Sequence, residues 1–274
     1  MLSRPDVSAF YDEFLESRML RYRLFGSPRL ERAARRITAY IKPGDRVLDV
    51  GCGIGIITER IARLARDGQV WGVDLSPRNA WYAGRTVRGR NVAFFAADVL
   101  SETATIRERT GGRFDVITMV DVIEHIPVAG RAALFATLRE LSAGRALLIL
   151  TYPSPQYQRY LQANQPQELQ IIDNIVELPT LLDEAGAAGY SLQHFSLETV
   201  RMPNRYVHCV LQTDAGLAAP AVRAPTLGAR SAERVRRTVR DAIMLPLRRW
   251  RYVTRVMRAE ATMSSPRRPT EPPP

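Results

Sequence analysis

The sequence predicts a doubly wound α/β fold, in which a mostly parallel sheet of seven strands is covered by helices on both faces. Short apolar runs rich in β-branched residues alternate with amphipathic segments of helical period. A glycine-rich turn joins the first of these runs to a helix, and an aspartate stands at the end of each of the first three. Such alternation is typical of parallel sheets, because each crossover between neighbouring strands is made by a helix.

The individual elements follow from the spacing of apolar residues and from the glycine and proline residues between them. Strands are expected at 46–50, 69–73, 92–96, 114–120, 145–150, 192–197 and 206–212. Helices are expected at 56–65, 77–88, 103–109, 128–141 and 175–188, and two more lie within 1–41. The last two strands are close in sequence, so we expect them to pair as a hairpin at one edge. Residues 152–172 are polar, aromatic and interrupted by proline, which indicates a long functional connection.

The positive charge is concentrated at the C-terminal end. The chain has 274 residues and a net charge of +11, and residues 221–274 carry 13 Arg against 4 acidic residues. We therefore expect an N-terminal helical cap (1–41), a main domain (42–214) and a linker with a basic tail that is partly disordered (215–274). Apolar residues recur at helical spacing in the tail, a pattern typical of helices that lie on an anionic membrane surface. Nucleic acid or a partner protein would use the same charges, and a solvated, partly ordered appendage is the other interpretation. The nearly balanced charge of the rest argues against nucleic acid as a partner.

Cysteine content and the first residues predict the compartment. Only two cysteines are present, Cys52 and Cys209, which are too few for a disulfide framework and are expected to be buried. The first residues lack a signal-peptide pattern, and no apolar run reaches the length of a membrane span. We expect a cytoplasmic protein that the tail brings to the inner face of the membrane.

The strongest chemical signal runs from Val47 to Gly55 and has the sequence Val-Leu-Asp-Val-Gly-Cys-Gly-Ile-Gly. Glycines at 51, 53 and 55 allow a sharp turn and a close approach of the backbone to a ligand. Dinucleotide sites prefer G-x-G-x-x-G, whereas the spacing here is G-x-G-x-G. Asp49 precedes the turn and would repel a pyrophosphate, but it suits a ligand that carries an ammonium group.

Two further acids mark the ends of the next strands. Asp74 ends the second strand, where a carboxylate can accept both hydroxyls of a ribose. Asp98 follows the third strand, where it can accept from the amino group of an adenine. The three acids are expected at successive carboxyl ends of one sheet, which is where ligands of open α/β folds bind.

These motifs resemble those of the class I S-adenosylmethionine-dependent methyltransferases, over about Pro43–Thr213. The resemblance implies the Rossmann-like methyltransferase fold and an adenosylmethionine pocket. Asp49, Gly51 and Gly53 would face the methionine moiety, Asp74 the ribose, and Asp98 with Val99 the adenine, which Leu75 would cover. The full set implied for the cofactor is Asp49, Gly51, Cys52, Gly53, Gly55, Asp74, Leu75, Asp98, Val99 and Val120.

A fourth motif, Asp121-x-x-Glu124-His125, follows the fourth strand. It is similar to the Glu-x-x-Glu-His stretch with which the ubiquinone-pathway O-methyltransferases and the small-RNA 2′-O-methyltransferases hold a divalent ion. Three interpretations stay open. The three side chains would hold Mg²⁺, or His125 would act as a general base without metal, or the stretch would only cap the next helix.

The resemblance also implies where the acceptor binds. The N-terminal helices and the segment after the fifth strand would cover it, with Tyr11, Arg18, Tyr152 and Tyr157 as candidate contacts. We expect O-methylation of a small-molecule or glycan-type acceptor. The alternatives are RNA 2′-O-methylation and a non-catalytic scaffold that binds adenosylmethionine. The RNA subgroup has a further ligand histidine, and His194 and His208 are predicted to lie in late strands as packing residues.

Overall fold

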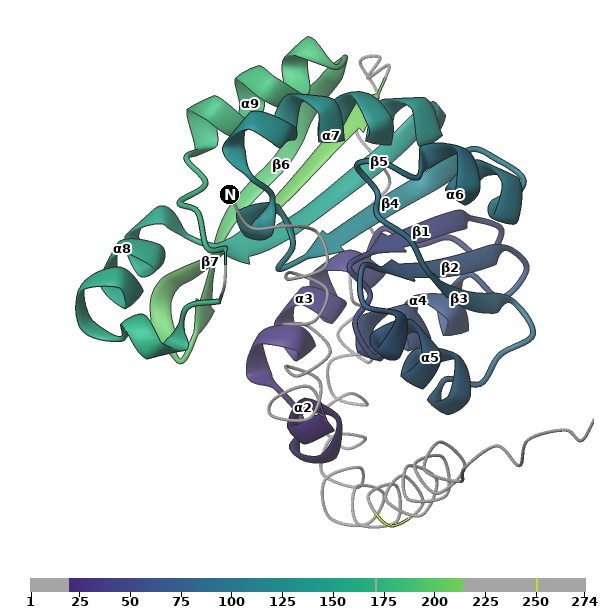
Figure 1. Cartoon of the computed structure of the whole chain (residues 1–274), viewed down its shortest axis with the longest axis horizontal. Coiled ribbons are helices and arrows are strands. Elements are labelled where there is room, and N and C mark those ends of the chain that lie inside the picture. The colour runs from purple at the N-terminus through teal and green to yellow at the C-terminus, as the bar shows by residue number, and fades with distance from the viewer. Residues whose placement is uncertain (1–19, 171, 214–249, 251–274) are drawn as a thin grey trace, which may run out of the picture. The chain divides into compact units, whose positions relative to one another are not determined.

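A single mixed sheet organises the described part of the chain. The computed structural model describes residues 20–170, 172–213 and 250. Its seven strands have the order β3-β2-β1-β4-β5-β7-β6 (Figure 1). β1 to β5 are parallel to one another, and β7 runs antiparallel to both β5 and β6. The predicted doubly wound sheet and its antiparallel edge hairpin are therefore confirmed.

Strands and helices alternate through most of the described chain. The strands are β1 (Arg46–Val50), β2 (Gln69–Asp74), β3 (Val92–Ala96), β4 (Phe114–Val120), β5 (Ser142–Pro153), β6 (Tyr190–Val200) and β7 (Met202–Thr213). The helices are α2 (Leu20–Phe25), α3 (Pro28–Thr38), α4 (Ile56–Leu64), α5 (Pro77–Thr86), α6 (Thr103–Thr110), α7 (Val128–Leu141), α8 (Pro155–Asn164) and α9 (Leu178–Ala187). Two short 3-10 turns, η2 (Ile123–His125) and η3 (Pro166–Glu168), complete the set.

Helices cover both faces of the sheet, and the central strands β1 and β4 are mostly buried. Helices α6, α7 and α9 cover one face, and α3, α4 and α5 cover the other (Figure 1). Leu48 of β1 and Leu148 of β5 belong to the apolar cluster on the first face, whereas their neighbours Val47 and Ile149 belong to the cluster on the second. Because successive side chains of a strand point to opposite faces, a sheet covered on both sides needs consecutive apolar residues.

The last strands and the segment after β5 differ most from expectation. β5, β6 and β7 are each longer than predicted, since polar residues at their ends still pair. The polar segment that was expected to be a long connection contains α8, which begins at Pro155 after the N-cap Ser154. Ser154 accepts from the Tyr157 amide, and proline in the first turn loses no hydrogen bond there.

Some expectations fall on residues that the structure does not describe. The first predicted helix and nearly all of the basic tail lie outside the described residues. The chain divides into two compact units, 1–223 and 224–274, and in the second only Trp250 is described. Within the described ranges, no helix combines the length and apolarity needed to cross a membrane.

Candidate functional site

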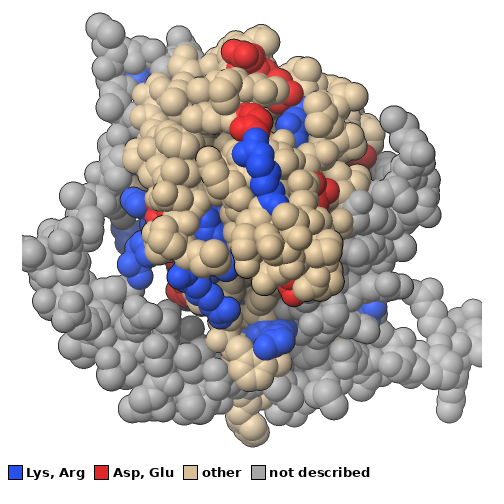
Figure 2. Space-filling model, turned by 90° about the vertical axis from the view of Figure 1, so that its left-hand side faces the viewer, with Lys and Arg blue, Asp and Glu red and all other residues tan. Residues whose placement is uncertain are grey.

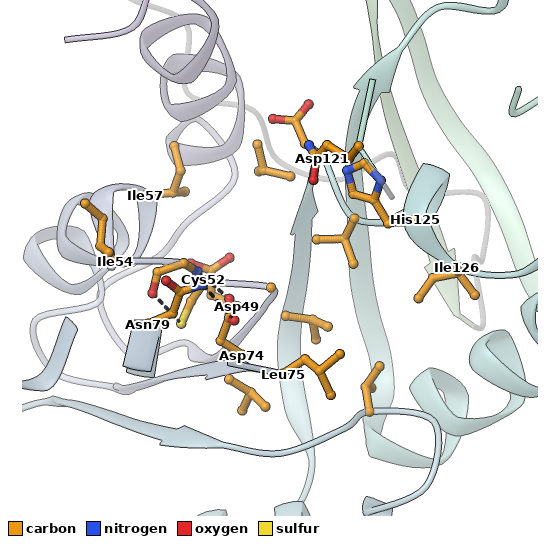
Figure 3. Close-up of a pocket in the computed structure, with 18 of the residues that line it drawn as sticks. Asp49, Cys52, Ile54, Ile57, Asp74, Leu75, Asn79, Asp121, His125 and Ile126 are labelled. Atoms are coloured by element: carbon orange, nitrogen blue, oxygen red, sulfur yellow. Dashed lines mark hydrogen bonds between the residues drawn. The ribbon is translucent and has the colours of Figure 1, made fainter. Parts of the chain in front are cut away.

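A pocket of about 330 Å³ opens at the carboxyl ends of the parallel strands. Its lining comes from the loops after β1, β2, β3 and β4, from α2 and α3, and from the chain near residue 172. Figure 3 shows Asp49, Cys52, Asp74 and Asn79 grouped on one side, with Asp121 and His125 on the other. This is the place where open α/β sheets bind ligands, as the sequence predicted.

Asp49 is a buried carboxylate at the end of β1, and only 2% of it is exposed. Its two oxygens accept hydrogen bonds from the hydroxyls of Thr58 (2.5 Å) and Thr118 (2.7 Å). Burial raises the pKa of Asp49 to about 6, and the nearby negative charge of Asp74 adds to that shift, which the two threonine hydroxyls oppose. The pocket therefore holds a carboxylate whose charge a cationic ligand would stabilise.

Asp74 orients the glycine-rich turn from the end of β2. One of its oxygens accepts from the Gly53 amide at 2.7 Å, and the other accepts from the Ser76 amide and from Asn79 Nδ2, both at 3.0 Å. These N–H groups fix the carboxylate in the pocket, where it faces the turn that it binds (Figure 3). Asp49 and Asp74 thus lie close together, as expected from their positions at adjacent strand ends.

The glycine-rich turn has a left-handed backbone at each of its three glycines. At Gly51, where φ is +69°, a Cβ would lie 2.3 Å from Cγ2 of Val122. Gly51 and Gly53 line the pocket, but Gly55 does not, although it was expected to contact the cofactor. Gly55 instead precedes α4, and a Cβ there would meet Val87 and Phe94. Its role is to allow the turn.

The other residues expected to contact the cofactor line the pocket: Cys52, Leu75, Asp98, Val99 and Val120. Cys52 is buried, as is Cys209, and both are free thiols. The Asp98 carboxylate accepts from the Leu100 amide and from the Ser101 hydroxyl, both at 2.9 Å. It is therefore engaged in the turn that follows β3 as well as facing the pocket.

Asp121 follows β4 and forms an ion pair with Arg29 of α3. The backbone of Asp121 is left-handed, with φ at 54°, and its amide donates to the Thr151 carbonyl (2.8 Å). The Arg29 guanidinium also lies over the rings of Tyr22 and Tyr206, at 5.7 and 5.8 Å from their centroids. The carboxylate of Asp121 is thus already compensated by a cation of the protein.

His125 lines the pocket, whereas Glu124 beside it does not. Nδ1 of His125 lies 2.5 Å from the Ile172 carbonyl oxygen, and Nε2 lies 3.8 Å from the Glu124 carboxylate. Burial raises the pKa of Glu124, and the neighbouring His125 acts in the opposite direction. The histidine is therefore held by its neighbours with its ring at the pocket.

The arrangement does not fit the Mg²⁺ site that the Asp121-x-x-Glu124-His125 motif suggested. Arg29 pairs with Asp121 where a metal would need that carboxylate, and Glu124 lies away from the pocket. In the described ranges, no three His, Cys, Asp or Glu side chains are grouped so that they could hold a metal ion. The described residues therefore do not support the metal interpretation, because a guanidinium is paired with the Asp121 carboxylate.

Two expected acceptor contacts lie elsewhere. Tyr152 is fully buried in the apolar cluster beneath α7 and α9, because it lies on the inner face of the extended β5. Tyr157 packs in a cluster with Tyr206 and accepts from the Arg205 guanidinium, and it does not line the pocket either. Tyr11 and Arg18 are outside the described residues. His194 and His208 lie in β6 and β7, as expected, and His208 is buried.

Several residues of the site were not predicted from the sequence. Tyr22 and Arg29 come from the N-terminal helices, Asn79 supports Asp74, and Ile172 supports His125. Asn79 follows the N-cap Ser76 in a Ser-Pro helix start, which is a local signal that could have located it. The contacts of Arg29 and Ile172 join distant segments, and no local pattern indicates them.

The close approach at Gly51 gives a direct test of the turn. Gly51→Ala should destabilise the protein by about 1–2 kcal/mol for the left-handed backbone and by a further ~1–3 kcal/mol for the clash with Val122. Gly111→Ala is the matched control, because Gly111 has φ of +70° but nothing within 4 Å of its Cβ position. Thermal unfolding measures both, and equal losses would show that the contact with Val122 carries no cost.

The chain matches the family model described as "Methyltransferase domain" over residues 12–195. Among curated proteins, it is 37% identical over 106 residues to a ubiquinone biosynthesis O-methyltransferase of Cereibacter sphaeroides, a match that covers 39% of this chain and 40% of that protein. A protein of the same name from Ralstonia nicotianae is 38% identical over 84 residues, covering 31% of this chain and 34% of that protein. The matches thus span less than half of these relatives.

Solved structures share the fold. Magnesium protoporphyrin IX methyltransferase from Synechocystis, with bound adenosylmethionine, superposes with a TM-score of 0.57 at 17% identity, covering 78% of this chain and 99% of that one. A TehB-like methyltransferase from Corynebacterium glutamicum gives 0.55 at 17% identity, covering 73% and 96%. These structures show the fold, and the family match over most of the chain shows that the protein belongs to the methyltransferase-domain family.

Proposed function

We propose that the protein methylates an oxygen atom of a small-molecule acceptor, with His125 as the group that takes the acceptor's proton. The observation that carries the proposal is the placement of His125. Its Nδ1 faces a carbonyl oxygen, which can only accept, so Nδ1 carries a hydrogen. When the ring is uncharged, the lone pair is then on Nε2, and an imidazole of this form that lines the pocket is suited to general-base catalysis.

The residues at the strand ends fit adenosylmethionine. Asp49 and Asp74 place two neighbouring carboxylates in a largely desolvated pocket, where a ligand with an ammonium and a sulfonium group would relieve their repulsion. In this proposal Asp49 and the glycine turn hold the amino-acid end, Asp74 the ribose, and Leu75 with Val99 the adenine. When bound, the cofactor would supply a methyl carbon for attack by the acceptor oxygen, with the carbon–sulfur bond breaking to leave S-adenosylhomocysteine.

The chain's own residues then position the acceptor and remove its proton. His125 would take the hydroxyl proton on Nε2 as the oxygen approaches the methyl group, and Arg29 with Asp121 would border the acceptor. Most of this work is orientation, because two reactants held in line react as though at a high effective concentration. The name of the Cereibacter relative, an O-methyltransferase, supports oxygen as the acceptor atom.

The lining of the acceptor side favours a ligand with an apolar body. Aliphatic side chains from α3, α4, the two residues that flank η2 and the segment after η3 line the pocket together with Arg29 and His125; they are Leu30, Ile56, Ile57, Val122, Ile126 and Ile172. A bare glycan would leave most of these groups without contact, whereas a hydroxylated ring would cover them. We therefore propose a ring hydroxyl rather than a sugar hydroxyl.

Nucleic acid is a less suitable acceptor for this surface. On the face shown in Figure 2, basic side chains of the described residues are interspersed with acidic ones among many uncharged residues. RNA binding depends on a continuous basic surface that neutralises phosphates. The contact of the basic tail with an anionic membrane falls on residues outside those described, and it stays a prediction.

The assignment of the base is tested by His125→Gln. Loss of the proton acceptor should lower kcat for a probe acceptor, catechol, by about 10²–10⁴-fold, while affinity for S-adenosylhomocysteine stays unchanged. His194→Gln is the control, because His194 lies on β6 and does not line the pocket. Product is measured by mass spectrometry, with a glycoside and a short RNA as competing acceptors. Equal activity of the two variants would contradict the role of His125.

The raised pKa of Asp49 predicts how cofactor binding depends on pH. Because only the ionised carboxylate attracts an ammonium group, adenosylmethionine affinity should fall as pH decreases through about 6. The decrease should approach about tenfold per pH unit below that value. Calorimetry from about pH 5 to about pH 8 measures it. Asp49→Asn, which still meets Thr58 and Thr118, should bind weakly and show no such dependence; a wild-type profile in this variant would refute the assignment.

The ion pair of Arg29 and Asp121 predicts turnover without a divalent ion. Protein treated with EDTA should methylate catechol at the rate of untreated protein, because the carboxylate of the motif is already paired with a guanidinium. If EDTA abolished activity and added Mg²⁺ restored it, the result would support the metal interpretation instead.

A further inference from the structure

The segment after η3 packs against the turn that carries His125. Asn174 binds this turn at both sides of the histidine, although it is far from it in the sequence. Its amide donates to the Glu124 carbonyl at 2.8 Å, and its side-chain Nδ2 lies 3.2 Å from the same carbonyl and 3.1 Å from the Ile126 carbonyl. The residues before and after His125 are thus both tied to one asparagine.

The same segment supplies the partner of the imidazole ring. The Ile172 carbonyl, two residues before Asn174, accepts from Nδ1 of His125 at 2.5 Å. Asn174 therefore fixes the main chain of the turn, while Ile172 fixes the ring. Since both contacts come from one short stretch, a shift of that stretch would move the carbonyl away from the ring.

Asp173, between these two residues, anchors the stretch to α8. Its carboxylate accepts from Nε2 of Gln158 and from the Gln170 amide, the latter at 3.1 Å. Gln158 is only 1% exposed, so the end of this anchor on α8 is buried. The position of the Ile172 carbonyl is consequently set by α8 through Asp173 and by η2 through Asn174.

We propose that Asn174 is a positioning residue for His125. Asn174 keeps the turn that carries His125 in register with the Ile172 carbonyl and so selects the tautomer with hydrogen on Nδ1. Asn174 does not line the pocket, so it acts through the histidine and not on the ligand. The inference rests on the proposed function only where it treats Nε2 of His125 as the base. The positioning itself can be measured without turnover.

The imidazole tautomer is the direct readout. The chain has three histidines, so each ring can be resolved in nitrogen-15 NMR of the full-length protein and assigned with His125→Gln, His194→Gln and His208→Gln. At about pH 8.5, where an ordinary imidazole is neutral, wild-type His125 should show the Nδ1-protonated pattern. Asn174→Asp removes the Nδ2 donor and sets a carboxylate against two carbonyl oxygens, so His125 should shift to a mixture or to the Nε2-protonated form.

Two further variants keep the experiment decisive. Asn174→Ala keeps the hydrogen bond from the backbone amide to the Glu124 carbonyl and adds no charge. It should therefore change the His125 tautomer in the same direction but to a smaller extent, and it provides the test if Asn174→Asp fails to fold. Asn164→Asp is the matched control, because Asn164 is exposed at the end of α8 and its Nδ2 binds only the Tyr160 carbonyl among the described residues. It should leave the His125 signals unchanged. Unchanged tautomers in a folded Asn174 variant would overturn the proposal.

Failure of the proposed function would look different. If the wild-type protein methylates none of the probe acceptors but the Asn174 variants change the His125 tautomer, the positioning stands and the acceptor proposal falls. If catechol turnover depends on His125 but not on Asn174, and the tautomer is constant, the base stands and the positioning falls. Affinity for S-adenosylhomocysteine should be equal in all variants, which confirms that the cofactor side remains intact.

Discussion

The site depends on keeping two like charges together out of water. Asp49 and Asp74 are both buried, and their proximity contributes to the raised pKa of Asp49. They stay in place because two threonine hydroxyls bind one carboxylate and three N–H groups bind the other. These donors fix the carboxylates before any ligand arrives, so a cationic ligand meets an arrangement that needs little reorganisation. The glycine turn is part of the same constraint, since the Gly53 amide is one of those donors.

On the opposite side of the pocket, a carboxylate lies next to a cation of the protein and not next to a second carboxylate. There the acid of the motif, Asp121, meets Arg29 from the N-terminal helices, and the guanidinium is held over two tyrosine rings. The Asp121 carboxylate of the motif, which could bind a metal ion in an open site, is thereby paired with a cation from the chain itself. His125 is then left beside a neutralised pair, with Ile172 deciding which nitrogen bears its hydrogen. This arrangement is the basis for the proposal that His125 acts as a base without a metal ion.

The sequence predicted the features that depend on the local pattern of residues along the chain. The alternation of strands and helices located the sheet, and the position of Asp49 and Asp74 at strand ends placed them in one pocket. Local pattern could not show how far β5 extends, and this extension carries Tyr152 into the core instead of the pocket. The contacts of Arg29 with Asp121, and of Ile172 with His125, join segments that are far apart in sequence, so only the folded chain reveals them.

The two sides of the pocket are consequently built by different parts of the chain. The side assigned to the cofactor comes from loops that directly follow β1, β2 and β3, so the sheet that forms the core also forms that side. The side assigned to the acceptor combines residues of α4 and of the loop after β4 with α2, α3 and the segment after η3, and these last three lie outside the alternating strand–helix units. Of these, α3 also packs on the sheet through Ala33, Ala34 and Ile37, so only its pocket-facing residues, such as Arg29 and Leu30, could change without disturbing the core. If the proposed assignment holds, substitutions at such positions would change the acceptor while the loops assigned to the methyl donor stay the same.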